Sequence, residues 1–291
     1  MFVLTTLDPR AAIHYAGPMS IRVIVLGDIV GTPGIRAIEQ LMPEMRIRYK
    51  PDLVIANAEN ASEGSGLTPI IFKQLRNAGV DGITLGDHCF KRMQIAPTLE
   101  SESVIIRPAN LPLAAKGRRW MALTPAGAAN RPKVYVATVL GRVFATLPAD
   151  DPFVCIETIL GQLPEVNPIV IIEVHAEATS EKQAIGWYMD GRAALVFGTH
   201  THVPTADARI LPSGTAYITD LGMTGPYESV IGRRIDRVLS QMTTAMPTPF
   251  DVATADVRVC GVLVDIDERS RKATHVERVE MQADLLAPPF V

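Results

Sequence analysis

The feature that most limits the fold is a repeated order of short apolar runs, polar loops and stretches with helical spacing. The first runs are IRVIVLGD at 21–28, DLVIANAEN at 52–60 and DGITLGDH at 81–88. Each is rich in branched aliphatic residues, as strands are. Alternation of such runs with helices predicts an α/β architecture with largely buried sheets.

Further strands are predicted along the rest of the chain, at 103–110, 134–144, 168–177, 193–202, 214–222, 257–267 and 273–281. We expect the last two to pair as a hairpin, which makes the sheets mixed rather than purely parallel. The segment 111–132 is rich in Pro, Gly, Ala and Arg and is predicted to be loop or edge structure.

Three helices have sequence signals. Apolar spacing predicts one over 36–49. Thr68 is expected to cap the next, with Pro69 at its first position and Gly79 after its end. Ser180 and Gln183 have the spacing of a capping box for a third helix.

The chain is long enough for a large core, because 47% of its 291 residues are hydrophobic. No linker divides it, so residues 20–291 are predicted to form a single domain. Residues 1–19 are predicted to be an N-terminal extension, with disorder as one option and Met19 as an alternative initiator. A signal peptide is not expected there, because charged residues interrupt the apolar core that one requires.

Composition also limits the cellular setting. No apolar run approaches the roughly 18 residues of a membrane span, so no membrane partner is expected. The three cysteines, Cys89, Cys155 and Cys260, lack CxxC spacing and predict a reduced, cytoplasmic protein rather than a disulfide framework. A net charge of −3 argues against a protein that coats nucleic acid through bulk charge.

Polar residues gather at the carboxyl ends of five predicted strands. Ligands of open α/β sheets bind just beyond such strand ends. The side chains concerned are Asp28, Glu59 with Asn60, Asp87 with His88, His175, and His200 with His202. We therefore expect them to meet at one site.

The pair His200 and His202 is predicted to face one cavity, because side chains two apart in a strand point the same way. Imidazole and carboxylate ligands favour Fe, Mn or Zn over Ca or Mg. The candidates outnumber one tetrahedral shell, so two metal ions sharing a carboxylate, roughly 3.5–4 Å apart, are predicted.

Other interpretations of these motifs are weaker. GDIVGTPG resembles a phosphate-binding loop but lacks both GxGxxG spacing and the GK[ST] ending. Cys89 is a possible ligand, although a small buried side chain is favoured. His14 and His275 lie outside the pattern. Amidohydrolases also use an HxH pair, but usually on the first strand of a barrel.

The motifs VLGDIVGTPG, VIANAENASEGSG, ITLGDH, VHAEATSEK, VFGTHTHVPTAD and AYITDLGMTGPYESVIG together resemble the YmdB-like branch of the calcineurin-like metallophosphoesterases. The resemblance runs from about Ile21 to Asp267. It implies a four-layer α/β/β/α sandwich of two mixed sheets flanked by helices. It also implies a dinuclear phosphodiesterase associated with 2′,3′-cyclic nucleotides, in which a metal-bridging hydroxide attacks phosphorus.

By position, the resemblance implies two ligand sets that share Glu59. One metal ion would be held by Asp28, Glu59, Asn60 and His202, and the other by Glu59, Asp87, His175 and His200. His88 would be the acid at the leaving oxygen. Gly222 and Thr224 follow another strand end and either line the substrate pocket or form a plain turn.

Asp87 departs from the family pattern, which reads GNH where this chain reads Gly86-Asp87-His88. The extra negative charge is expected to favour an Fe(III)-containing metal pair or to slow turnover. An alternative function follows, namely a non-catalytic or weakly active regulatory or RNA-associated protein. The expected partners are a small phosphodiester or cyclic nucleotide, RNA ends, and further copies of the chain in a homo-oligomer.

Overall fold

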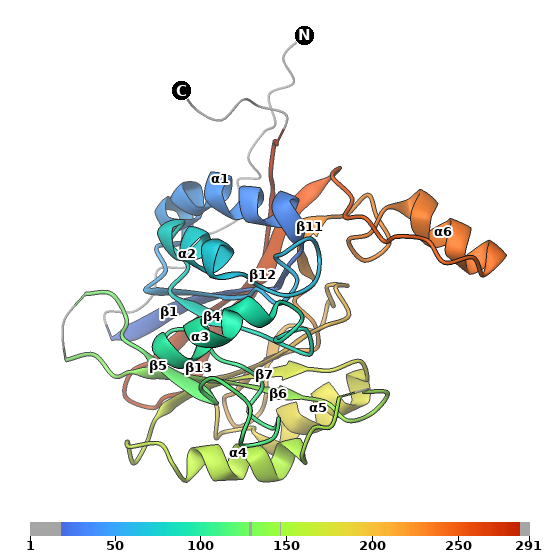
Figure 1. Cartoon of the computed structure of the whole chain (residues 1–291). Coiled ribbons are helices and arrows are strands. Elements are labelled where there is room, and N and C mark those ends of the chain that lie inside the picture. The colour runs from blue at the N-terminus through green and yellow to red at the C-terminus, as the bar shows by residue number, and fades with distance from the viewer. Residues whose placement is uncertain (1–18, 128–129, 146, 286–291) are drawn as a thin grey trace.

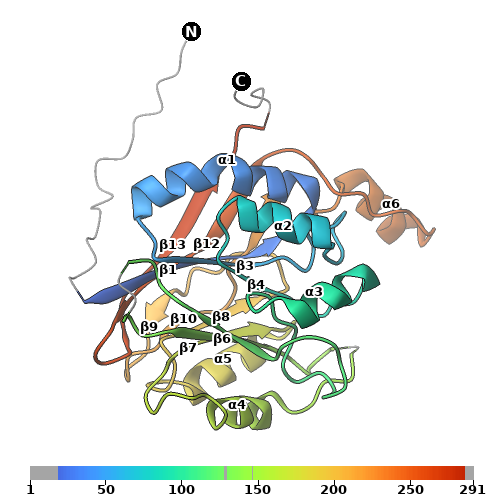
Figure 2. The same ribbon diagram turned by 60° about the vertical axis from the view of Figure 1, so that its left-hand side comes forward.

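The computed structural model describes residues 19–127, 130–145 and 147–285. Two β-sheets lie face to face, and helices cover their outer faces (Figures 1 and 2). The predicted four-layer sandwich is therefore confirmed. The expected extension lies outside the described residues except for Met19.

The first sheet has seven strands in the order β2-β11-β12-β1-β3-β4, with β13 paired to β12. It is mixed, because β1 runs parallel to β3 and antiparallel to β12. The predicted hairpin between β12 and β13 is present. The strands are β1 Ser20–Leu26, β2 Asp28–Ile29, β3 Leu53–Asn57, β4 Gly82–Thr84, β11 Met223–Pro226, β12 Val257–Asp267 and β13 Ala273–Gln282.

The second sheet has six strands in the order β5-β6-β7-β8-β10-β9. Its four central strands are parallel, and β5 and β9 run antiparallel at the edges. Parallel strands place their carboxyl ends together. The strands are β5 Trp120–Leu123, β6 Val134–Leu140, β7 Ile169–His175, β8 Leu195–Thr199, β9 Arg209–Ile210 and β10 Ala216–Ile218.

The helices α1 and α2 cover the first sheet, and α4 and α5 cover the second, whereas α6 extends to one side (Figure 1). Thr68 caps α2 as predicted, because its hydroxyl accepts from the Ile71 amide at 3.2 Å. No helix among the described residues has both the length and the apolar character to cross a membrane. The helices are α1 Gly31–Tyr49, α2 Pro69–Asn77, α3 Ala96–Ser101, α4 Pro152–Leu160, α5 Thr179–Tyr188, α6 Ile235–Thr244 and the 3₁₀ turn η1 Met93–Ile95.

The core follows the two-residue period of the strands. On β1, Val23 and Val25 belong to the apolar cluster between the sheets, whereas Ile24 and Leu26 face the α1 and α2 side. On β7, Ile171 packs between the sheets and Ile172 packs toward α4 and α5. Both faces of each central strand are buried, which explains the continuous apolar runs in the sequence.

The strand predicted at 103–110 is wrong, because that segment makes one isolated bridge, Ile83 to Ile105. Beyond it the backbone leaves the first sheet: the Arg107 amide donates to Arg118 and the Ala109 amide to Thr138. The segment therefore connects the two sheets.

Two helix starts also differ from the predictions. The first helix begins at Gly31 rather than at residue 36, with Pro33 in its first turn, where a proline is tolerated. The capping box is wrong, because α5 begins at Thr179 with Ala178 at the cap position, so Ser180 lies inside the helix.

Candidate metal centre

The structure brings the predicted strand ends to one place between the two sheets. Asp28 follows β1, Glu59 and Asn60 follow β3, and Asp87 and His88 follow β4. From the second sheet come His175, the last residue of β7, and His200 and His202, which follow β8. Residues from separate parallel strands therefore form one cluster of carboxylate, amide and imidazole groups.

Four of these residues form the tightest group. Ligand atoms of Glu59, Asp87, His175 and His200 all lie within 4.8 Å of one another. His175 Nε2 lies 3.2 Å from Glu59 Oε1 and 3.0 Å from Asp87 Oδ1. His200 Nδ1 lies 3.4 Å from the same Asp87 oxygen. Only glycine fits at position 86, because a Cβ there would lie 2.3 Å from the His175 ring.

The other predicted ligands adjoin this group. Asn60 Nδ2 lies 3.2 Å from His202 Nε2 and 3.4 Å from Glu59 Oε1. Asp28 is fully buried, and its Oδ2 accepts from the His200 amide at 3.1 Å. Asp28 Oδ1 is buried with no hydrogen-bond partner among the described residues. A buried acceptor without a donor is costly, and a cation at that atom would satisfy it.

The two histidines after β8 converge through a turn rather than through strand alternation. The strand ends at Thr199, and His200 and His202 have φ angles of 92° and 63°. Asp220 accepts hydrogen bonds at its Oδ2 from the Thr201 hydroxyl at 2.6 Å and from the Lys182 ammonium at 2.7 Å. The turn that places both imidazoles is therefore fixed by buried charges behind it, and the prediction from strand geometry was wrong.

His88 lies at the open side of the cluster, and its side chain is part-exposed. Its amide donates to Glu59 Oε2 at 2.9 Å, and its Nδ1 lies 2.7 Å from Asn60 Oδ1. Its Nε2 lies 3.7 Å from Asp87 Oδ2. The ring is thus oriented by Asn60 and directs its other nitrogen toward the Asp87 side.

Burial and mutual contact perturb the acidities of the cluster. Burial raises the pKa of Asp28 well above its usual value, although His175 opposes the change. Burial works to lower the pKa of His175, but Glu59 and Asp87 outweigh it and raise that pKa well above normal. Burial also opposes ionisation of Asp87, yet hydrogen bonds with His175 and His200 hold its pKa below the usual range. Perturbed groups concentrated in one place are typical of functional sites.

The cluster fits a metal centre on its own chemistry. Glu59 and Asp87 lie against imidazole rings, and Asp28 lies against the backbone of His200. Within the described chain no Lys or Arg makes an ion pair with these three carboxylates. Neighbouring carboxylates repel each other unless a cation or proton intervenes. Mixed nitrogen and oxygen ligands suit a first-row transition metal. Cys89 is buried with its pKa raised to about 12, which favours the structural interpretation of its thiol.

A second layer of polar residues was missed from the sequence. Glu173 is fully buried on β7 and accepts from Asn57, Thr138 and Thr199 at 2.6, 2.9 and 2.6 Å. The Thr199 hydroxyl also lies 2.9 Å from His175 Nδ1, so the network orients that ring. The signal was present, because Glu173 is the one carboxylate within the apolar run IVIIEVH. Such supporting partners commonly tune metal ligands.

A cavity of about 250 Å³ opens beside the cluster. Its lining includes Asp87, His175 and His200 together with Leu140 and Phe144. Gly222 and Thr224 do not line it: Thr224 is fully buried on β11, next to β2. Their contact with a substrate remains a prediction.

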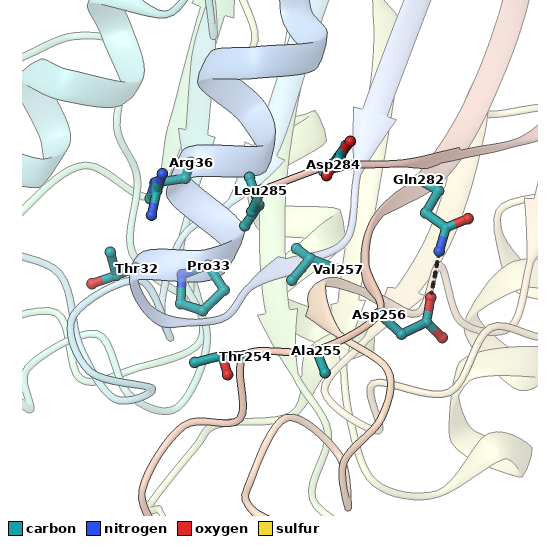
Figure 3. Close-up of a pocket in the computed structure, with 11 residues that line it drawn as sticks. Thr32, Pro33, Arg36, Thr254, Ala255, Asp256, Val257, Gln282, Asp284 and Leu285 are labelled. Carbon is teal, nitrogen blue, oxygen red and sulfur yellow. Dashed lines mark hydrogen bonds between the residues drawn. The ribbon is translucent and has the colours of Figure 1, made fainter. Parts of the chain in front are cut away.

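A larger hollow of about 810 Å³ lies at the start of α1, beside Thr254–Val257 and Gln282–Leu285 (Figure 3). Its polar side chains are partly engaged with one another, since Gln282 donates to Asp256 at 3.0 Å. None of the residues that line it belongs to the metal centre. The smaller cavity is therefore the one that adjoins the candidate ligands.

Residues 24–279 match the model of the YmdB-like protein family. The chain belongs to this family. It is 41% identical over 263 residues to the 2′,3′-cyclic-nucleotide 2′-phosphodiesterase of Bacillus subtilis strain 168, covering 90% of this chain and 98% of that relative. The family resemblance inferred from the motifs is therefore confirmed.

Two solved structures of similar proteins support the same assignment. A hypothetical protein from Thermus thermophilus has a TM-score of 0.83 at 40% identity. The match covers 91% of this chain and 100% of the Thermus chain. A structure described as a novel phosphatase from Mycoplasma pneumoniae also has a TM-score of 0.83, at 33% identity. That match covers 92% of this chain and 95% of the Mycoplasma chain. This YmdB-like chain therefore shares its fold with a phosphatase over nearly its whole described length.

Proposed function

We propose that this chain is a metal-dependent phosphodiesterase that hydrolyses 2′,3′-cyclic nucleotides. The observation that carries the proposal is the cluster of Asp28, Glu59 and Asp87 with imidazoles and without a Lys or Arg ion pair among the described residues. The similarity to a 2′,3′-cyclic-nucleotide 2′-phosphodiesterase supports the substrate class.

The ligand atoms divide into two sets that share Glu59. In the first, Asp28, Glu59, Asn60 and His202 would hold one ion. In the second, Glu59, Asp87, His175 and His200 would hold another, and iron or manganese suits both sets, with zinc as an option. When bound, such ions polarise a phosphoryl oxygen and lower the pKa of a water molecule.

His88 is proposed to carry the proton that the leaving oxygen needs. Its Nδ1 is engaged with Asn60 Oδ1 at 2.7 Å, which leaves Nε2 as the atom that holds and delivers the proton. The part-exposed position of the ring allows it to reach a substrate in the cavity beside Asp87. General-acid help of this kind contributes about 10²–10⁴-fold to a rate.

The test compares two substrates in Mn²⁺ or Fe²⁺ and after chelation, namely 2′,3′-cAMP and bis-p-nitrophenyl phosphate. Wild type should hydrolyse both only with metal. His88→Ala should lose about 10²–10⁴-fold on 2′,3′-cAMP but much less on the aryl ester, whose leaving group departs without a proton. His275→Ala, outside the cluster, is the matched control. Metal-independent activity, or none with any metal, would refute the proposal.

Asp87 supports one competing proposal, a weakly active regulatory or RNA-associated protein. Its ionised carboxylate adds negative charge where the family pattern has asparagine, so an anionic substrate is attracted less strongly. Metal analysis and kinetics of wild type and Asp87→Asn separate the alternatives. A faster Asp87→Asn variant with altered iron content fits the phosphodiesterase with a modified centre. Tight metal binding without turnover in both proteins, together with saturable RNA binding, would favour the regulatory protein.

We also propose a homo-oligomer in the cytoplasm. The three cysteines are free and buried, as suits a reducing compartment. The helix α6 extends away from the sheets and exposes Ile235, Leu239 and Met242 at helical spacing (Figure 1). Sedimentation of wild type and Leu239→Glu tests the assembly, since a charge on this stripe should shift the protein toward monomer.

A further inference from the structure

The lining of the cavity beside the metal centre combines two chemically different kinds of side chain. Polar groups come from Asp87, His175, Glu177 and His200, and apolar surface comes from Leu140, Phe144 and Leu147. A nucleotide has the same division, because its phosphate is anionic and its base is a flat apolar ring system. The apolar side chains of the lining are not metal ligands and are available for another role.

Phe144 is unusual among these apolar residues. Its exposed fraction is 82%, although it is a large aromatic residue, and its φ angle of 62° lies in the left-handed region. Of the ring contacts among the described residues, none involves Phe144. An exposed ring on strained backbone contributes little to folding, and such features cluster at functional sites.

The turn that carries Phe144 is nonetheless tied to the metal centre. The Gly141 amide donates to the carbonyl of His175 at 3.0 Å. The Arg142 amide donates to both Glu181 oxygens at 2.8 and 3.0 Å, and the Val143 amide donates to one of them at 3.3 Å. A side chain at position 141 would lie 2.5 Å from Ala176 Cβ as well as 2.3 Å from Glu181 Oε2, so glycine is required. The ring is therefore held beside the ligand His175.

We propose that Phe144 is the stacking platform for the nucleobase of the substrate. The assignment rests on the proposed phosphodiesterase function and identifies what selects a nucleotide over another phosphodiester. Stacking of one base on one aromatic ring changes affinity by about 5- to 150-fold and tolerates different bases, because every base has a π face.

The experiment compares a substrate that has a base with one that lacks it. The pair is 2′,3′-cAMP and glycerol 1,2-cyclic phosphate, which share the five-membered cyclic phosphodiester. Phe144→Ala should raise KM for 2′,3′-cAMP by about 10-fold or more and leave the base-free substrate unchanged. Phe144→Trp should keep the wild-type preference, and Phe250→Ala, at another exposed phenylalanine, should behave as wild type.

Equal losses on both substrates, or no loss on either, would overturn the platform role. A second measurement does not depend on turnover: adenosine 3′-monophosphate should quench the fluorescence of the tryptophan in Phe144→Trp beyond any change in wild type, and ribose 5-phosphate should not. Absence of this quenching would also overturn the proposal. Failure of the proposed function is distinguishable, because wild type would then hydrolyse neither substrate with any metal.

Discussion

Two regions of the protein bury charged side chains, and they handle the charge differently. Behind the turn after β8, Lys182 Nζ lies 2.7 Å from Asp220 Oδ2, and both side chains are almost fully buried. Asp220 also accepts from the Thr201 hydroxyl and, at its Oδ1, from the Gly222 amide at 2.8 Å. Each oxygen of the Asp220 carboxylate has a donor, so the buried charges of this region are fully paired.

The metal centre lies on the other side of this turn, and its buried charges are not all paired. Glu59 and Asp87 have imidazoles as their only ion-pair partners among the described residues, Asp28 has no ion-pair partner there, and Asp28 Oδ1 has no hydrogen-bond donor. The difference separates the buried charges that stabilise the fold from those that are suited to bind a ligand. Removing a charge should therefore destabilise the first region, whereas in the second it should abolish function.

The largest effect is expected for Glu59→Gln, which removes the carboxylate that the two proposed ligand sets share. Loss of metal-based charge stabilisation is worth several kcal/mol, so the rate should fall by about 10³-fold or more. The free energy of unfolding of the metal-free protein should change little, because the repulsion that is lost with Asp28 offsets the attraction that is lost with His175. Steady-state kinetics and urea unfolding measure the two quantities. Glu63→Gln, at an exposed glutamate, is the control. A fully active Glu59→Gln variant would contradict the difference drawn between the two regions.

Lys182→Met should have the opposite profile. It leaves Asp220 buried without its cation, and breaking a buried pair in this way costs about 3–5 kcal/mol of unfolding free energy. Urea unfolding of the metal-free protein measures the loss. The double variant Lys182→Met with Asp220→Asn removes both charges and should recover most of it. Unchanged stability in the single variant would show that the pair is not structural.

Metal removal should reproduce the contrast without a substitution. A ligand that binds only the folded state stabilises it, by about 2.7 kcal/mol when present at a hundredfold excess over its dissociation constant. Chelation should therefore lower the melting temperature of wild type and of Lys182→Met, and leave that of Glu59→Gln nearly unchanged. An equal shift in all three proteins would mean that the metal binds elsewhere.

The smallest effect is expected where the two regions meet, at Thr201. Thr201→Val deletes the hydroxyl that donates to Asp220 at 2.6 Å. The loss of one such hydrogen bond to a carboxylate should cost about 1.5–3 kcal/mol of unfolding free energy. Turnover should also fall, because the turn between His200 and His202 loosens, while Thr201→Ser should match wild type. Urea unfolding and kinetics on the three proteins detect both changes.

Much of the centre was predictable because its residues follow apolar runs. A buried strand has no reason to end in Asp28, Glu59 or His175 unless its end meets a site, and parallel topology then brings these ends together. The alternation of runs likewise indicated the two buried sheets. These signals are local in the sequence.

The features that were missed depend on distant contacts. The turn at His200 and His202 has positive φ angles because Asp220 and Lys182 hold it, and both lie about 20 residues away. The expected strand at 103–110 had adequate composition but a neighbour on one side only. The helix α4 was overlooked despite a readable signal, since Asp151 caps it and Pro152 begins it.

Metal content tests the central claim most directly. Wild type, Glu63→Gln and Glu59→Gln would be purified under the same conditions, incubated with Mn²⁺ or Fe²⁺, desalted and measured by elemental analysis. We predict about two transition-metal ions per chain in the first two proteins and fewer than one in Glu59→Gln. Wild-type protein that retains no metal, or Glu59→Gln protein that retains as much as wild type, would contradict the account.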